Sequence, residues 1–503
     1  MAAAVETPRE RRRLALAVSL LAAAYLATRL ALTWRFPLYV DETTFASFAR
    51  DVHGNLGQFF AAEIDQKGLL PSWLGAGLIG VGIDPVTAMR LLAAAGAALA
   101  AVCGGLLMRR LYGLREGLLT AGLIALGPYF LVNASVGIYD AMVTGLVAAA
   151  ILAAVRLAQR PRLVTALLLG VAIGAGGLTK PTASVALVVL PFTLLLFDYA
   201  SPDLRRRLLR WAAFAILAVA IGYALTSIAR LSSLYGRPMV PRENHRDLGQ
   251  IFDDIGPSLT GNGPLMGMAL YGYLTLPGIL LAITGVVSGL RRHRAATTIL
   301  LVWTVSVIVS ALFLALWPYP RYFAAAMVPL SAFVALGIVA VWDAIVGHRW
   351  LHRSSRLALA TAVVVLALLP AAHYEGLVLA DPVHTPYPGA DLEGYIWATS
   401  AQTWVDPAAR QIERRGGPYP VRIDVLSGYT WGLDLRLNGA SVGSADRYDV
   451  VLGGTPAQIA QARYLVTDGA RGDTPPRPGF RLIFRKARPL GGAVTRVFER
   501  TRP

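Results

Sequence analysis

Long apolar runs separated by short polar stretches make up the chain as far as about residue 372. A helix needs about 20 mostly apolar residues to cross the hydrocarbon core of a membrane. Eleven runs approach or meet this requirement, near residues 14–34, 87–109, 116–134, 139–158, 162–179, 181–198, 210–230, 268–290, 296–317, 322–345 and 355–372. The pattern predicts an α-helical polytopic membrane protein with about 11 transmembrane helices. We expect the first run, which is longer than the core of a signal peptide, to be retained as an anchor.

One further apolar stretch, Leu69 to Gly82, has 14 residues and contains Pro71, so it is too short to cross comfortably. Counting it as a span would place every later loop on the opposite side of the membrane. We therefore expect residues 35–86 to form one external loop that contains interfacial or re-entrant helices.

Arginine clusters between the runs predict the orientation. Arg9 and Arg11 to Arg13 precede the first run. Alternation of the spans puts five more groups on the same side, namely Arg109/Arg110/Arg115, Arg156/Arg160/Arg162, Arg205/Arg206/Arg207/Arg210, Arg291/Arg292/Arg294 and Arg349/Arg353/Arg356. Basic loops face the cytoplasm. The prediction is a multi-pass protein of the plasma (inner) membrane with a cytoplasmic N-terminus and an extracytoplasmic C-terminal part.

The chain changes character after residue 372, where Pro, Gly and Asp become frequent. A helical pattern near 402–415 is followed by short strand-like runs at 421–426, 449–452, 463–466, 480–484 and 493–498. This pattern predicts two domains, a transmembrane domain at 1–372 and an extracytoplasmic α/β domain at 373–503.

Composition supports this division and changes the meaning of the net charge. Of the 503 residues, 55% are hydrophobic and 15% are charged, which argues against a soluble enzyme. The net charge is +17, but the predicted cytoplasmic segments hold 20 basic and 6 acidic residues, whereas the other charges of residues 1–372 balance at 11 and 11. Most of the excess is therefore a signal of topology, and no nucleic-acid partner is expected. The single cysteine, Cys103, excludes an intrachain disulfide.

Acidic and basic residues at the outer ends of the spans are the candidates for chemistry, because charge near hydrocarbon is costly. They come from separate loops and are Asp41, Glu42, Lys67, Asp140, Lys180, Arg321 and its neighbour Tyr322. A longer outer loop is a candidate substrate-binding loop and contains Arg237, Arg242, His245 and Arg246. A carboxylate at this face can take a proton from a hydroxyl nucleophile, and Lys or Arg can hold a phosphate.

Five of these residues also have an ordinary structural interpretation. Asp41 and Glu42 fit a solvated loop start, Asp140 fits a helix N-cap, Lys180 fits an interfacial anchor, and Arg321 fits an aromatic belt. The ordinary interpretations do not predict that all of them fall on one side of the membrane. No glycine-rich phosphate loop is present in the sequence, and a donor that reacts outside the cell must arrive attached to a lipid.

The order of these motifs resembles the GT-C superfamily of membrane glycosyltransferases, in the branch of the protein O-mannosyltransferases and the lipid A aminoarabinose transferase. The resemblance covers roughly residues 10–330 and rests on Tyr39-Val40-Asp41-Glu42, Lys67-Gly68-Leu69-Leu70 with Trp73, Arg90-Leu91, Arg109-Arg110-Leu111-Tyr112-Gly113, Gly127-Pro128, Tyr139-Asp140, Leu178-Thr179-Lys180-Pro181 and Pro320-Arg321-Tyr322.

The resemblance implies a glycosyltransferase that moves a hexosyl or pentosyl group from a polyprenyl-phosphate donor to an extracytoplasmic glycan, lipid or protein, with inversion. It implies that Asp41 is the main catalytic carboxylate, supported by Glu42, and that Asp140 is the second acid. The residues implied to contact the donor phosphate are Lys67, Lys180, Arg321 and Tyr322.

Several points stay open at this stage. Gly68-Leu69-Leu70-Pro71 follows the lysine, where the family often has aromatic or Pro-Pro residues, and the tail does not identify the acceptor. No cofactor is required, although Asp41 and Glu42 leave a divalent cation open. The alternatives are a transporter or flippase of a lipid-linked saccharide, which would need polar residues at mid-membrane, and a non-catalytic envelope scaffold.

Overall fold

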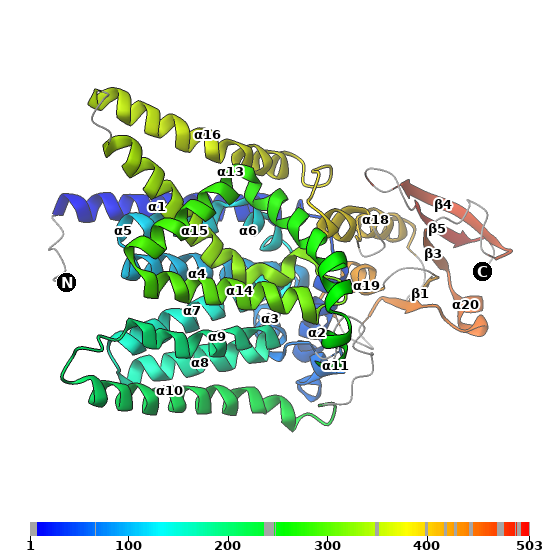
Figure 1. Ribbon diagram of the computed structural model, residues 1–503. Coiled ribbons are helices and arrows are strands. Elements are labelled where there is room, and N and C mark those ends of the chain that lie inside the picture. Colours follow the sequence, from blue (N-terminus) through cyan, green and yellow to red (C-terminus); the bar gives the residue numbers. More distant parts are fainter. Residues whose placement is uncertain are drawn as a thin grey trace.

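The computed structural model describes residues 8–65, 67–235, 246, 248–347, 352–397, 401–416, 420–426, 430–441, 446–469, 477–487, 489 and 494–501. Within these residues a bundle of long helices carries a small β-sheet unit at one end (Figure 1). The chain is thus an α-helical polytopic membrane protein with a C-terminal α/β unit, as the apolar pattern predicts.

The helical bundle contains α1 (Pro8–Thr33), α4 (Pro85–Leu111), α5 (Leu114–Leu126), α6 (Pro128–Asn133), α7 (Tyr139–Gln159), α8 (Leu163–Thr179), η3 (Pro181–Ser184), α9 (Val185–Val189), η4 (Leu190–Leu196), α10 (Leu204–Thr226), η5 (Ser227–Leu231), η6 (Ser258–Asn262), α13 (Gly263–Arg292), α14 (Arg294–Leu314), η7 (Pro320–Phe323), α15 (Ala324–Gly347) and α16 (Arg353–Ala380). Among the described residues, seven helices are long and apolar enough to cross a membrane, and several shorter apolar helices lie beside them. Each of the predicted apolar runs falls on helix. The run at 116–134 is broken into α5 and α6 because Pro128 starts a new helix.

The arginine clusters meet at the end of the bundle that is far from the sheet. Arg292 Nη2 lies 3.3 Å from Glu116 Oε1, which joins the α13–α14 turn to the start of α5. Arg110 donates to the side chain of Gln159, and Arg207 donates to the Gln159 carbonyl at 3.5 Å. These contacts bring four of the predicted groups, those at 109–115, 156–162, 205–210 and 291–294, to one end of the bundle.

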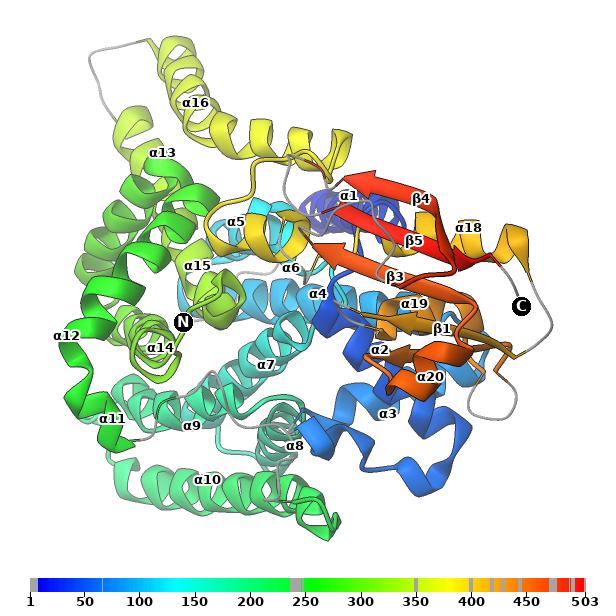
Figure 2. The same cartoon turned by 90° about the vertical axis from the view of Figure 1, so that its right-hand side faces the viewer.

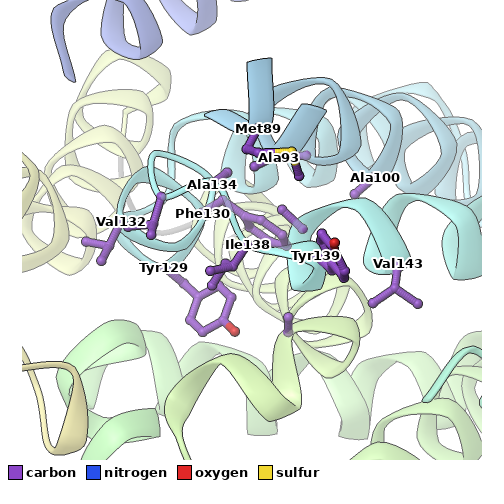
Figure 3. Packing of buried hydrophobic residues seen from close by; sticks show 14 of the residues in the cluster. Met89, Ala93, Ala100, Tyr129, Phe130, Val132, Ala134, Ile138, Tyr139 and Val143 are labelled. Atoms are coloured by element: carbon purple, nitrogen blue, oxygen red, sulfur yellow. The ribbon is translucent and has the colours of Figure 1, made fainter. Parts of the chain in front are cut away.

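The opposite end carries the first external loop, in which α2 (Val40–Gly54), η1 (Leu56–Gln58), η2 (Ala61–Asp65) and α3 (Leu69–Gly80) follow one another. The short apolar stretch of the sequence is the single helix α3. Below this loop, Met89 and Ala93 of α4 pack near Phe130, Ile138 and Tyr139 in the buried core (Figure 3). Two further short helices, α11 (Leu248–Asp253) and α12 (Ile255–Pro257), lie before α13.

The C-terminal unit has one five-stranded sheet in the order β2-β1-β3-β5-β4. Its strands are β1 (Val421–Val425), β2 (Tyr448–Leu452), β3 (Tyr464–Gly469), β4 (Phe480–Ala487) and β5 (Val494–Arg500), and all five match the predicted runs. Strand β1 pairs in parallel with β2 and β3, and parallel pairs need crossover connections. The sequence prediction included α18 (Val405–Arg415) but omitted the two crossover helices, α19 (Trp431–Asn438) and α20 (Pro456–Gln461).

The sheet unit docks directly on the first external loop (Figure 2). The Gln402 amide donates to the Leu38 carbonyl at 2.8 Å, and Tyr39 forms a β-bridge with Ala401. Arg50 of α2 pairs with Asp434 of α19 at 2.7 Å. The C-terminal unit is therefore held next to the helix start that carries Asp41.

Candidate active site

Asp41 lies in the first turn of α2, shortly after the first membrane helix. A carboxylate is favoured in this position because the backbone N–H groups at a helix start carry partial positive charge. Asp41 Oδ2 is 2.7 Å from Arg321 Nη2, and its side chain is 28% exposed. The carboxylate therefore has a cationic partner and remains accessible.

Arg321 lies in η7, the short turn before α15, and is almost completely buried. Its Nη1 donates to the Tyr39 hydroxyl at 2.6 Å. Its guanidinium also lies 5.2, 4.8 and 5.7 Å from the ring centroids of Tyr39, Tyr319 and Tyr322. Burial raises the pKa of Tyr39, so this phenol stays a neutral acceptor. Arg321 is thus a cation enclosed by aromatic rings, with one carboxylate beside it.

A second ion pair adjoins the first. Asp140 occupies the first turn of α7, and Lys180 ends α8. Lys180 Nζ is 2.5 Å from Asp140 Oδ1 and 4.8 Å from the centroid of the Tyr322 ring. Because Tyr322 also lies against Arg321, one aromatic ring contacts both cations. The Asp41–Arg321 and Asp140–Lys180 ion pairs therefore meet at Tyr322 and form one continuous polar surface.

Lys67 reaches the same region because the first external loop passes very close to the end of α8. A side chain at Gly68 would place its Cβ 2.0 Å from the Thr179 carbonyl oxygen, so only glycine permits this approach. Lys67 Nζ lies 3.7 Å from Asp65 Oδ2 and 5.9 Å from the Phe45 ring centroid. This is a looser arrangement than that of Lys180, and it leaves the ammonium group more accessible.

Aromatic packing connects Lys67 with the second ion pair. The Phe45 ring stacks on Tyr139 at 3.8 Å, and Tyr139, which precedes Asp140, shares a 3.2 Å hydrogen bond with Ser72. Burial raises the pKa of Asp65, Lys67 opposes this shift, and the nearby charge of Asp41 adds to it. The predicted residues Asp41, Lys67, Asp140, Lys180, Arg321 and Tyr322 therefore lie together.

Glu42 does not face this cluster, although it follows Asp41 directly. Its Oε1 and Oε2 lie 2.5 and 2.8 Å from Arg90 Nε and Nη2, and the Gly137 amide donates to Oε1 at 2.7 Å. The Glu42 side chain is fully buried. Its contacts join the start of α2 to α4 and to the loop before α7, which places it in the wall behind the site.

The carboxylates present do not form a ready set of metal ligands. Asp41 faces Arg321, whereas both oxygens of Glu42 accept from Arg90, so this dipeptide does not direct two carboxylates at one point. Within the described part of the chain, no group of three or more His, Cys, Asp or Glu side chains is placed to hold a metal ion.

The candidate substrate-binding loop is only partly described. Arg237, Arg242 and His245 lie outside the described residues. Arg246 is bound elsewhere, since its Nη1 donates to the Ala315 carbonyl at 2.7 Å and its Nε is 3.2 Å from Asp254. Arg246 thus anchors this loop to the end of α14.

Two residues next to the cluster received no role in the sequence interpretation. Arg90 belongs to the Arg90-Leu91 motif, and an arginine at the start of an apolar helix is a signal that it has a buried partner. Asp391 lies in the tail that was predicted to be an outer domain, and its position behind Arg321 had no detectable signal in the sequence.

Comparisons with known proteins place this geometry in a family context. A family model described as dolichyl-phosphate-mannose-protein mannosyltransferase matches residues 66–228, which include Lys67, Asp140 and Lys180. A comparison with curated protein sequences found no significant match.

Several solved structures have a similar fold. ArnT from Cupriavidus metallidurans in the apo state has a TM-score of 0.57 at 16% identity, covering 95% of this chain and 97% of that chain. The same protein bound to undecaprenyl phosphate gives 0.57 at 17% identity with the same coverage. The archaeal oligosaccharyltransferase AglB from Archaeoglobus fulgidus, in complex with an inhibitory peptide and a dolichol-phosphate, gives 0.50 at 15%, covering 91% of this chain and 70% of that one.

The chain therefore has a fold similar to those of ArnT and the archaeal oligosaccharyltransferase AglB. Residues 66–228 also match the mannosyltransferase family model, in line with the resemblance on which the motif order rests.

Proposed function

We propose that the protein transfers one sugar from a polyprenyl-phosphate donor to an acceptor on the outer side of the membrane. The observation that carries this proposal is the pairing of Asp41 with Arg321 and of Asp140 with Lys180 around one tyrosine ring. The cluster combines a partly accessible carboxylate with several cations, which suits a hydroxyl nucleophile and a phosphate leaving group. It lies at the end of the bundle that carries the sheet unit.

In the proposed reaction, the acceptor hydroxyl oxygen forms a bond to the anomeric carbon of the donor. The bond between that carbon and the phosphate oxygen breaks, and its electron pair goes to the phosphate. Asp41 accepts the proton that the hydroxyl loses. The step is a single in-line displacement and inverts the anomeric carbon.

The ion pairs support an exchange of partners during donor binding. In the structure Arg321 and Lys180 are neutralised by Asp41 and Asp140. A donor phosphate offers both cations a second anion, and a phosphate that draws Arg321 away leaves Asp41 as a free base. Lys67, with its looser partner Asp65, is a third cation that the phosphate can recruit without breaking a short ion pair.

The arginine-rich end of the bundle is proposed to face the cytoplasm, since basic loops do so in membrane proteins generally. The sheet unit and the cluster are then extracytoplasmic, and the membrane is proposed to be the plasma (inner) membrane. The relatives support a lipid-linked donor because one is bound to undecaprenyl phosphate and another to a dolichol-phosphate. The donor is proposed to carry a hexose or a pentose, and the acceptor to be a glycan, a lipid or a protein.

The test is to incubate the purified protein in liposomes with a labelled polyprenyl-phosphate sugar, with and without candidate acceptors. We expect release of polyprenyl phosphate, together with free sugar where water is the acceptor or with the glycosylated acceptor where one is added. A transporter or flippase would instead move the intact donor between leaflets, and a scaffold would do neither. Either of those results would overturn the proposed function. Mass spectrometry of lipids that copurify with the protein would identify the donor.

A further inference from the structure

The segment between the last membrane helix and the sheet unit carries a buried carboxylate behind the donor cluster. Asp391 lies in α17 (Ala390–Leu392), after α16 ends at Ala380 and before the sheet unit begins. It is buried, and the Tyr273 hydroxyl of α13 donates to it. The reaction proposed above does not use this group, and a buried carboxylate is costly unless it has a function or good partners.

Contacts run from Asp391 to the backbone next to Arg321. The Tyr273 ring lies edge-on to Tyr129, with the ring centroids 5.2 Å apart. The Tyr129 hydroxyl donates to the Pro320 carbonyl at 3.0 Å, and Pro320 directly precedes Arg321. A shift of Asp391 therefore reaches the turn that carries the arginine through only two side chains.

The same segment supports Arg321 from its other side. Tyr395, in η8 (Glu393–Trp397), lies edge-on to Tyr39 at 5.1 Å, and its hydroxyl donates to Asn133 Oδ1 at 3.1 Å. Tyr39 is the residue whose hydroxyl accepts from Arg321. Two residues of the segment after the last span, Asp391 and Tyr395, are thus connected to Arg321 through different neighbours.

The segment is seated too closely on α13 to be a loose linker. A side chain at Gly272 would place its Cβ 2.3 Å from the Pro388 Cβ, so the helix and the segment are in direct contact beside Tyr273. The segment is therefore fixed to the membrane bundle independently of the sheet unit.

Several groups set the charge of Asp391. Burial raises its pKa to about 7, and the Tyr273 hydrogen bond and the Arg321 charge oppose this rise. The carboxyl is therefore protonated at a pH well below 7 and ionised at a pH well above 7. The charged group that faces it is Arg321 of η7. The titratable hydroxyls around it come from α6, α13, α16 and the segment itself, and belong to Tyr129, Tyr273, Tyr374, Tyr387 and Tyr395.

We propose that Asp391 is a positioning residue that fixes Arg321 for the donor phosphate, so that the segment after the last span completes the donor site. This inference rests on the proposed function, because it assumes that Arg321 receives the donor phosphate. Asp391 does not touch the donor in this arrangement. It acts through Tyr273, Tyr129 and the Pro320 carbonyl, and through its charge on Arg321.

The test measures the affinity for undecaprenyl phosphate of the full-length protein in nanodiscs at about pH 6 and about pH 8, on either side of the Asp391 pKa. Asp391→Asn mimics the protonated carboxyl, so it should bind like the wild type at the lower pH. At the higher pH it should bind about tenfold more weakly, a typical size for a coupling through packed side chains. The phosphate of the lipid itself titrates, with a second pKa of about 6. The Kd of each variant is therefore divided by the Kd of the wild type at the same pH, which removes this effect.

Two further variants sharpen the test. Tyr273→Phe removes the hydrogen bond that favours the ionised carboxyl of Asp391, so the pKa of Asp391 should rise. The midpoint of the pH dependence of lipid binding should therefore lie at a higher pH in this variant than in the wild type. Asp381→Asn is the matched control, since Asp381 lies earlier in the same segment, is exposed, and pairs with His384. It should bind like the wild type at both pH values.

Each outcome decides the inference. A loss in Asp391→Asn that is the same at both pH values means a merely structural role and overturns it, as do unchanged or tighter binding at the higher pH. If Asp391→Asn does not fold, the Tyr273→Phe midpoint decides, and an unshifted midpoint overturns it. A wild-type protein that binds no undecaprenyl phosphate instead overturns the proposed function itself.

Discussion

The surroundings of Arg90 and of Arg321 contain the same ion pair in two different forms. Arg90 holds both oxygens of Glu42, and its remaining N–H groups donate to backbone carbonyls, including that of Pro37 at 3.2 Å. Arg321 makes one contact to Asp41, and its other neighbours are aromatic rings and a phenol. The first guanidinium has its donors committed to the protein, whereas the second keeps capacity for a ligand.

The difference arises within one turn of helix α2. Successive residues of an α-helix point about 100° apart, so Asp41 and Glu42 face different surroundings although they are adjacent. Glu42 points inward to α4 and is saturated, and Asp41 points to the accessible side. We infer that one carboxylate stabilises the loop and that the other is available for chemistry. Four substitutions test this comparison.

The largest effect is expected for Asp41→Asn. The amide cannot accept the proton of the acceptor, so sugar transfer should fall by about a hundredfold to ten-thousandfold, the range for loss of a general base. The melting temperature should change little, because the side chain is partly exposed and Asn can still accept from Arg321. Transfer of labelled sugar and thermal unfolding of the same preparation measure the two quantities.

Asp51→Asn is the matched control for that experiment, since it removes a carboxylate from the same helix about 15 Å further along its axis. It should keep near wild-type transfer. Full transfer by Asp41→Asn, or an equal loss in both variants, would contradict the assignment of the base to Asp41.

The sequence was sufficient to place the apolar helices, because long apolar runs form helices regardless of their neighbours, although only seven of the described helices are long and apolar enough to cross a membrane. It was also sufficient to bring Asp41, Asp140 and Lys180 to one face, because alternation of the spans decides the side. It could not separate Asp41 from Glu42, since that depends on the position of Arg90 some 48 residues later. Nor could it place Asp391, because the fold-back of the segment after α16 depends on its packing against α13.

Glu42→Gln should have the next largest effect. It should lower the stability of the fold and leave the chemistry of sugar transfer intact. Removing the charge leaves Arg90 buried without its counter-ion, and breaking a buried pair in this way costs about 3–5 kcal/mol. A lowered melting temperature in detergent or nanodiscs, with transfer retained at low temperature by the folded fraction, is the expected result. If the variant is as stable as the wild type but inactive, Glu42 belongs with Asp41 in the chemistry.

Arg321→Lys should have a moderate effect that is confined to the donor. Lysine keeps the charge but cannot contact Asp41, the Tyr39 hydroxyl and three rings at once, because it lacks the planar guanidinium. The KM for the donor should rise by about tenfold, typical of one lost charge-assisted contact, with a smaller fall in the melting temperature than in Arg90→Lys because fewer hydrogen bonds to the protein are lost. Arg90→Lys is the matched variant and should show the reverse, a lower melting temperature and an unchanged KM. Equal behaviour of the two variants would remove the distinction between the two arginines.

The smallest effect is expected for Arg115→Gln at the opposite end of the bundle. Arg115 Nη1 is 3.0 Å from Asp343 Oδ1, within ion-pair distance, but the two side chains are 57% and 53% exposed. An exposed pair contributes about 0–1 kcal/mol, so melting temperature and transfer should both stay close to wild type. This exposed pair makes one contact, whereas the buried Arg90 pair makes two, so Arg115→Gln and Glu42→Gln together compare an exposed ion pair with a buried one. A destabilisation as large as that of Glu42→Gln would mean that burial is not what distinguishes them.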